Sequence, residues 1–335
     1  MRALVAGHWS GPGGRGGVPA SAALAQVAAG FRAAAPGWEI DAVPFGPGEA
    51  FAQAVASSPA RGLAPIPVGI EEASTRRAGE RVLAALDAGL TPVVEGGHAI
   101  DSDAGLGLVS VLSGVDVRPT PASLDEDAAR ALALARARVA GADLIAAAST
   151  SRPLLGMSSV MAVGLDLEPR ASQDRGLTAA LGRMFRGARP LRPLLPVAGE
   201  PAGPASAAAT DPSRQPGSGA AGGAAAMILA LGGRLVSTGA LLADVTELGA
   251  RLDRADLVVV AEPLLHSPHL ADALLDTVTA AAAERALPVV AIGAESSLSA
   301  HEAAQWGLHG VLTVGAGGDA LVEGGRRVAR TWART

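Results

Sequence analysis

Two aspartates and a histidine share one glycine-rich stretch of this 335-residue chain. His98, Asp101 and Asp103 follow residues 90–95, whose apolar pattern predicts a buried strand, and a helix is expected after residue 107. Carboxylates and an imidazole on one loop could bind a magnesium ion or a hydroxy acid. One of the aspartates could instead cap the start of the following helix, so both interpretations stay open.

A second glycine cluster, Pro-Gly-Ser-Gly-Ala-Ala-Gly-Gly at residues 216–223, opens directly onto an apolar helix. Backbone N–H groups beside a helix N-terminus could cradle an anion such as a phosphate or a carboxylate. The glycines could instead serve only to allow a tight turn and close helix packing. The stretch is not a Walker P-loop, because no Lys-Ser or Lys-Thr follows its last glycine.

Further charged side chains follow other expected strands. Arg15 lies in the first glycine-rich loop, Glu49 follows the second expected strand, and Glu262 and His266 follow a later one. Loops at the carboxyl ends of parallel strands are where open α/β sheets bind ligands. These side chains are therefore candidates for a binding or catalytic site.

The histidines of these loops, His8, His98, His266 and His269, could form a metal site. The spacing of His266 and His269 is loose, however, and such spacing is more typical of coincidence than of metal ligation.

Composition excludes several kinds of chemistry. The chain has no cysteine, lysine, asparagine or tyrosine, so disulfides, thiolate metal sites and Schiff-base lysines are impossible. Hydrophobic residues make up 49% of the chain and the net charge is −5, which is typical of a globular protein that binds no nucleic acid. No apolar run is long enough to cross a membrane and the N-terminus lacks a signal-peptide pattern, so we expect a cytoplasmic protein.

Strand and helix patterns alternate at both ends of the chain. The strands expected near Ala3, Ile40, Leu257, Val289 and Val311 are short and apolar, with helical patterns between them. This order predicts an α/β fold with a Rossmann-like, doubly wound parallel sheet.

The middle of the chain predicts a second, inserted α/β domain. Helices are expected at 73–89 and 122–140 and strands at 90–95 and 143–148. The residues 57–70 are rich in proline and glycine, and we expect them to form a connection.

We expect the first domain to comprise residues 1–65 and 245–335 and the second to comprise residues 66–244. Within the second, residues 149–163 are expected to form a loop and a short helix, and the aperiodic residues 189–215 a mobile loop. A further helix is expected at 243–250.

Several motifs in the same order resemble the bacterial glycerate kinase family. They are the glycine cluster at 216–223, Ala-Asp-Leu-Val at 255–258, Pro-Val-Val-Ala-Ile-Gly at 288–293 and Leu-His-Gly-Val-Leu-Thr at 308–313. The turn at 96–107 also resembles that family's Gly-Gly-Ser-Ala-Thr-Asn-Asp-Gly-Gly-Ala-Gly, with one residue inserted.

The resemblance implies a Rossmann-like domain interrupted by a second α/β domain. It also implies ATP-dependent phosphoryl transfer to D-glycerate or a similar small hydroxy acid, with ATP and Mg²⁺ as cofactors. Arg15, Asp103 and Glu262 would then be catalytic. The substrate and nucleotide would be bound by Glu49, Gly96, Gly97, His98, Asp101, Gly105, Gly217, Ser218, Gly219, Gly222, Gly223 and His266.

The sequence also departs from the family at charged positions. Arg15 stands where the family's first loop, Asp-Ser-Phe-Lys-Gly, has its lysine, and two family aspartates are lost within residues 149–154. Glu49 is kept while an aspartate near it is lost, and Glu262 is kept while an arginine and an aspartate near it are lost. Phosphoryl transfer depends on such charges, so the alternative is a catalytically silent member that binds a small acid, a nucleotide or a protein partner.

Overall fold

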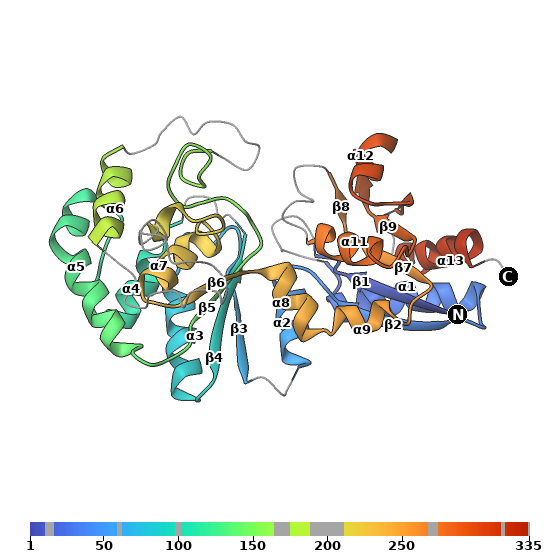
Figure 1. Cartoon of the computed structure of the whole chain (residues 1–335), viewed down its shortest axis with the longest axis horizontal. Coiled ribbons are helices and arrows are strands. Elements are labelled where there is room, and N and C mark those ends of the chain that lie inside the picture. The colour runs from blue at the N-terminus through green and yellow to red at the C-terminus, as the bar shows by residue number, and fades with distance from the viewer. Residues whose placement is uncertain are drawn as a thin grey trace, which may run out of the picture. The chain divides into compact units, whose positions relative to one another are not determined.

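The chain folds into two compact units, and the first is made from both ends of the sequence. Unit 1 comprises Met1–Arg61 and Thr238–Thr335, and unit 2 comprises Gly62–Ser237. The computed structural model (Figure 1) describes residues 1–10, 17–58, 62–97, 102–163, 175–187, 211–266, 274–315 and 319–333.

Unit 1 contains a five-stranded parallel sheet in the order β11-β9-β7-β1-β2. Its strands are β1 (Arg2–Gly7), β2 (Glu39–Pro44), β7 (Leu257–Ala261), β9 (Val289–Gly293) and β11 (Gly310–Thr313). Ala3 pairs with Ile40 on one side and with Leu257 on the other. The Rossmann-like parallel sheet predicted from the five apolar runs is thereby confirmed.

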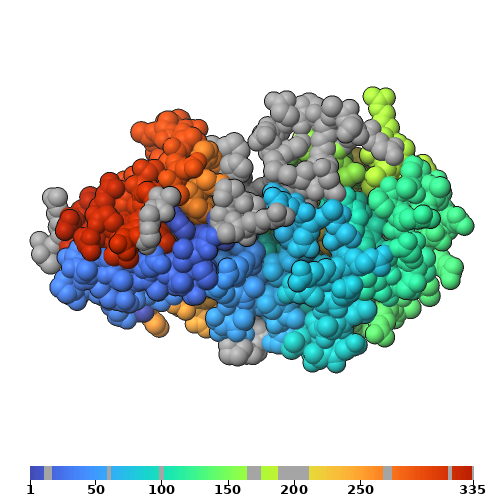
Figure 2. Space-filling view, turned by 180° about the vertical axis from the view of Figure 1, so that it is seen from behind, coloured from blue at the N-terminus to red at the C-terminus, as the bar shows by residue number. Residues whose placement is uncertain are grey.

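Unit 1 contains the helices α1 (Ala20–Ala34), α2 (Glu49–Ala56), α8 (Thr238–Val245), α9 (Leu248–Leu252), α11 (Leu275–Ala283), α12 (Ala300–Gln305) and α13 (Ala320–Trp332). Helices α1, α2 and α13 contact strands of the sheet. Helices α1 and α13 also lie side by side (Figure 2), and the first and last parts of the chain share one core. Phe31, Val259 and Ile292 are fully buried in that core.

Unit 2 contains a four-stranded parallel sheet in the order β3-β4-β5-β6. The strands are β3 (Leu63–Pro67), β4 (Thr91–Gly96), β5 (Ile145–Ala148) and β6 (Arg234–Ser237). The helices are α3 (Arg76–Asp87), α4 (Leu106–Ser113), α5 (Pro121–Arg138), α6 (Arg175–Gly187) and α7 (Ala224–Ala230). This is the second α/β domain that the sequence predicts.

One strand lies where the sequence predicted only a connection. Strand β3 falls within residues 57–70, and its Pro65 and Pro67 obscured the strand pattern. Proline has no N–H to donate, so it is tolerated where a strand needs partners on one side only. Because β3 is the edge strand of its sheet, it can carry both prolines.

Two helix predictions were also wrong. Residues 149–163 form turns and no helix. The helix expected at 243–250 is divided into α8 and α9, because Glu247 between them adopts a left-handed backbone conformation with φ of 53°. Of the expected loop at 189–215, the part up to residue 210 lies outside the described residues, and Pro212–Arg214 forms one 3₁₀ turn capped by Asp211.

The division into units differs from the expected domain ranges by four residues at the first boundary and by seven at the second. Strand β3 starts before residue 66 and pairs with β4 of unit 2. Helix α8 starts before residue 245 and contacts α2, α9 and α11 of unit 1. No helix in the described part of the chain is long and apolar enough to span a membrane.

The contact between α1 and α13 predicts a strong requirement for Gly30. A Cβ atom there would lie 1.8 Å from the carbonyl oxygen of Val322, so the two helices would have to move apart. We expect Gly30→Ala to destabilise the protein by about 1–3 kcal/mol, as overpacking does in other cores. Gly37→Ala is the control, because a Cβ there meets no atom within 4 Å. Equal urea midpoints for the two variants would contradict the prediction.

Candidate functional site

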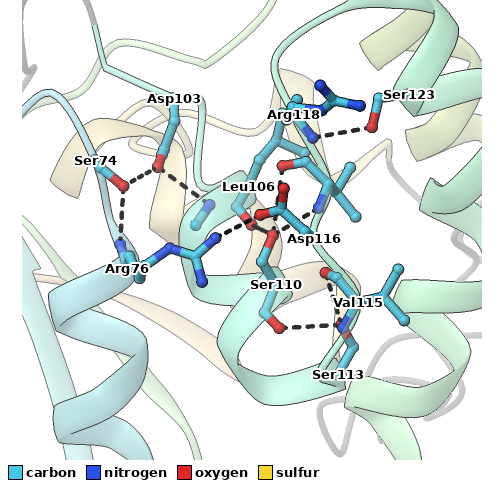
Figure 3. Close-up of polar contacts among 12 residues, drawn as sticks. Ser74, Arg76, Asp103, Leu106, Ser110, Ser113, Val115, Asp116, Arg118 and Ser123 are labelled. Atoms are coloured by element: carbon cyan, nitrogen blue, oxygen red, sulfur yellow. Dashed lines mark hydrogen bonds and ion pairs between the residues drawn. The ribbon is translucent and has the colours of Figure 1, made fainter.

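Asp103, one of the predicted catalytic residues, is buried just before α4 in unit 2. Its Oδ2 accepts hydrogen bonds from Ser74 Oγ at 2.7 Å, Thr75 N at 2.9 Å and Gly107 N at 3.1 Å. Its Oδ1 accepts from Thr75 Oγ1 at 2.8 Å and Gly105 N at 3.1 Å. The side chains of Ser74 and Asp103 point toward each other in Figure 3.

These five donors give Asp103 a structural task. A carboxylate has about four lone-pair positions, and here the protein itself occupies them. The bonds from Gly105 and Gly107 cap the start of α4, and those from Ser74 and Thr75 tie that start to the segment before α3. These bonds support the capping interpretation of Asp103, and its catalytic role stays a prediction.

The end of α4 is fixed by a hydroxyl group in the same region. Ser110 Oγ donates to the carbonyl oxygen of Leu106 at 2.8 Å and accepts from Val117 N at 2.9 Å. Arg76 and Asp116 form an exposed ion pair at 2.6 Å nearby (Figure 3). These contacts hold the loops around α4 in one arrangement.

The glycine cluster at 216–223 also forms hydrogen bonds with other groups of the protein. Leu154 N donates to Ser218 Oγ at 3.0 Å, and this serine is fully buried. The backbone amides that donate to protein carbonyls are those of Gly217, Ser218, Gly219, Ala220, Ala221 and Gly223. A phosphate cradle needs amides that point at the ligand, so this bonding favours the turn-and-packing interpretation, and the anion cradle stays an untested prediction.

The glycines are required because two stretches of backbone meet here. A Cβ at Gly105 would lie 2.6 Å from the carbonyl oxygen of Gly223, and one at Gly223 would lie 2.6 Å from the carbonyl carbon of Ala104. Both glycines also have positive φ, at 83° and 88°. Ser102 Oγ donates to the carbonyl oxygen of Gly222 at 2.7 Å and joins the same two stretches.

The remaining glycines predicted to bind a ligand belong to the same packing. A Cβ at Gly96 would lie 2.9 Å from the carbonyl oxygen of Val68, and one at Gly219 would lie 2.7 Å from Val160. The carbonyl oxygen of Gly97 accepts a hydrogen bond from Ala221 N. The structure thus brings the two glycine-rich stretches of unit 2 together, as parts of its interior.

In unit 1, two ionisable side chains meet at the carboxyl ends of neighbouring strands. Gly7 of β1 is the register partner of Ala261 of β7, so the next residues, His8 and Glu262, emerge side by side. Nε2 of His8 lies 2.9 Å from Oε2 of Glu262, and both side chains are buried. Glu262, predicted to be catalytic, is therefore paired with a histidine that was considered only as a metal ligand.

Two other predicted residues of unit 1, His266 and Glu49, contact different side chains. His266 follows β8 (Leu264–Leu265) and lies 4.0 Å from Glu295 of β10 (Glu295–Ser296), which is largely exposed. Glu49 opens α2, and its carboxylate accepts a hydrogen bond from Gln53 at 2.8 Å.

Four residues considered at the sequence level lie outside the described residues. They are Arg15, His98, Asp101 and His269.

The acidic and histidine side chains of the described residues do not gather into a metal site. No group of three or more histidine, aspartate or glutamate side chains that could hold a metal ion occurs in the described ranges. Asp103 is fully hydrogen-bonded within the protein, and Glu262 contacts His8. We therefore assign no magnesium ligands among the described side chains.

Sequence reasoning missed one buried acid in unit 2. Glu95 at the end of β4 is 1% exposed, and Ser149 Oγ, just after β5, donates to its Oε1 at 2.5 Å. A charged residue that ends an otherwise apolar strand was the available signal. Strand ends carry the ligand sites of α/β sheets, so this pair belongs among the candidates.

Comparison with known proteins identifies the family. The model of the glycerate kinase family matches residues 52–331. The chain belongs to the glycerate kinase family. This confirms the resemblance seen in the sequence motifs.

Uncharacterized proteins of Mycobacterium bovis and Mycobacterium tuberculosis are each 29% identical to this family member over 252 residues. The match covers 75% of this chain and 58% of the length of each relative. The crystal structure of "putative glycerate kinase 2 from Salmonella typhimurium LT2" superposes with a TM-score of 0.67, over 99% of this chain and 98% of that one. At 21% identity, this likeness shows the fold.

The bonding of Asp103 predicts that its carboxylate stabilises unit 2. Asp103→Asn replaces one acceptor oxygen by an NH₂ group that faces hydrogen-bond donors. A buried donor left without an acceptor costs about 1–3 kcal/mol, so we expect a clear fall in melting temperature. Asp116→Asn is the control, since an exposed ion pair contributes only about 0–1 kcal/mol. A variant of Asp103 with unchanged melting temperature and lost activity would favour the catalytic assignment instead.

Proposed function

We propose that this glycerate kinase family member transfers a phosphoryl group from ATP to D-glycerate. The observation that carries the proposal is the family match over residues 52–331. The fold shared with the Salmonella typhimurium structure is consistent with it. We further propose that the protein acts in the cytoplasm on a small hydroxy acid and binds no nucleic acid.

The proposed reaction needs positive charge near the transferred phosphoryl group. The chain contains no lysine, so arginine must supply this charge from the protein. Arg15 corresponds to the lysine of the family's first loop, and its guanidinium can bind a phosphate or a carboxylate with two hydrogen bonds. ATP would supply the phosphoryl group, and Mg²⁺ would neutralise charge on its phosphates.

Glu262 is the described carboxylate that best suits the acceptor side of this proposal. It follows β7 at the carboxyl edge of the unit 1 sheet, where α/β sheets bind their ligands. A carboxylate there can accept the proton of a substrate hydroxyl group, provided that it is ionised. Its Oε2 lies 2.9 Å from Nε2 of His8.

A catalytically silent member of the family is the second candidate. The observation that favours it is the internal hydrogen bonding of Asp103 and of the glycine cluster at 216–223. A protein of this kind would bind a small acid, a nucleotide or a protein partner without turnover.

The kinase proposal predicts dependence on Arg15. In a coupled ADP-release assay with D-glycerate, we expect Arg15→Ala to lower turnover by about 10² or more, because one preorganised electrostatic donor is removed. The melting temperature should stay close to that of the wild type. Arg77→Ala is the matched control, since Arg77 is exposed on α3. Equal turnover of the wild type and Arg15→Ala would remove Arg15 from the site.

Ligand binding separates the two candidate functions. We expect Mg-ATP and D-glycerate to raise the melting temperature, because a ligand at 100 times its Kd adds about 2.7 kcal/mol of apparent stability. Stabilisation by a ligand without ADP release would support the silent member. No stabilisation by Mg-ATP, ADP or D-glycerate, together with no turnover, would leave the protein-partner role.

A further inference from the structure

His8 connects Glu262 to the base of the first glycine-rich loop in unit 1. Its Nε2 lies 2.9 Å from Glu262 Oε2, and its Nδ1 accepts a hydrogen bond from Ser10 N at 3.3 Å. Ser10 in turn forms an isolated antiparallel bridge with Gly17. One imidazole ring therefore touches both a strand-end carboxylate and the residue that closes the base of the loop.

These contacts define where the imidazole carries its hydrogen. Nδ1 accepts from a backbone N–H, so it must present a lone pair. A neutral ring whose Nδ1 accepts carries its hydrogen on Nε2, the nitrogen that lies 2.9 Å from a carboxylate oxygen of Glu262. The arrangement therefore selects the neutral imidazole with its hydrogen on Nε2.

The ring is also fixed by packing. A Cβ at Gly46 would lie 2.4 Å from Cδ2 of His8 and 2.8 Å from its Cγ, so only glycine leaves room for the ring. The backbone is held as well, because His8 N donates to the carbonyl oxygen of Ala261 at 2.9 Å and Phe45 N donates to that of Gly7. His8 therefore has little freedom to turn away from Glu262.

The contact also orients the carboxylate. Oε2 of Glu262 is directed to His8, and Oε1 has no hydrogen-bond partner among the described residues. A carboxylate that must accept a proton from a substrate hydroxyl needs one oxygen held in place and one available.

We propose that His8 is a positioning residue for Glu262 in the phosphoryl transfer proposed above. It holds the carboxyl group of Glu262 in place through the contact at Nε2, and it anchors this pair to the Ser10–Gly17 bridge through Nδ1. The inference rests on the proposed function for its kinetic consequence. The state of the imidazole can be tested without turnover.

Two substitutions at position 8 separate the two contacts. The amide of His8→Gln can place an N–H near the position of Nε2 and keep the contact with Glu262. The amide of His8→Asn can place an oxygen near the position of Nδ1 and keep only the contact with Ser10. We expect His8→Asn to lower kcat by about tenfold or more with little change in KM, and His8→Gln to retain most of the kcat.

His301→Gln is the control for these assays, because His301 is exposed on α12. A loss of kcat that is equal in His8→Gln and His8→Asn, and that follows a fall in melting temperature, would overturn the positioning role and make His8 a packing residue.

Nitrogen-15 NMR of histidine-labelled protein tests the inference independently of the kinase activity. We expect the His8 signals, assigned by their loss in His8→Gln, to show a hydrogen on Nε2 and a lone pair on Nδ1. Glu262→Gln should shift the Nε2 signal, and Gly46→Ala should also shift it by displacing the ring. A hydrogen on Nδ1, or an Nε2 signal indifferent to Glu262→Gln, would overturn the proposal.

If the wild type shows no turnover, the NMR outcome still decides the inference. The expected tautomer with a Glu262-dependent signal would support the pairing of His8 with Glu262, and the failure would then belong to the proposed kinase activity.

Discussion

The close approach of two glycine-rich stretches is the constraint on which unit 2 depends. Backbone atoms of residues 102–107 lie so near those of 216–223 that a Cβ at Gly105 or Gly223 would overlap a carbonyl group of the opposite stretch. Such an approach buries many peptide groups, and buried peptide groups need partners. Asp103 supplies part of this need from its carboxylate, and the amides of the second stretch find carbonyl groups of the protein. The glycines of both stretches are thus explained by packing, whether or not the turn also binds a ligand.

In unit 1, the register of two parallel strands positions the ionisable side chains. Because β1 and β7 are neighbours and Gly7 lies opposite Ala261, the chain must deliver His8 and Glu262 to the same edge at the same height. The approach of Gly46 to the imidazole then leaves the ring one place to lie. A buried carboxyl group needs a polar neighbour in a protein interior, and Nε2 of His8 lies 2.9 Å from the carboxyl group of Glu262.

Family membership and local chemistry carry different information about this protein. The match over residues 52–331 shows the family, and the structural likeness shows the fold, but both tolerate changes at charged positions. In this protein His8 and Glu95 bring ionisable groups to strand ends. A fold depends mainly on apolar packing, whereas phosphoryl transfer depends on a few charges, so the first can persist while the second is rearranged.

The sequence alone determined which segments form the unit 1 strands and that a second α/β unit exists. Buried parallel strands are continuous apolar runs, so they can be recognised directly in the sequence. It could not reveal β3, whose prolines are acceptable only because that strand lies at a sheet edge. Nor could it decide whether the amides at 216–223 face a ligand or whether Asp103 acts on one. The partners of those groups lie far away along the chain: Ala221 N donates to the carbonyl oxygen of Gly97, and Asp103 accepts from Thr75 N. Only the tertiary structure shows which donor meets which acceptor, since hydrogen-bond satisfaction depends on distances across the fold and leaves no local pattern in the sequence.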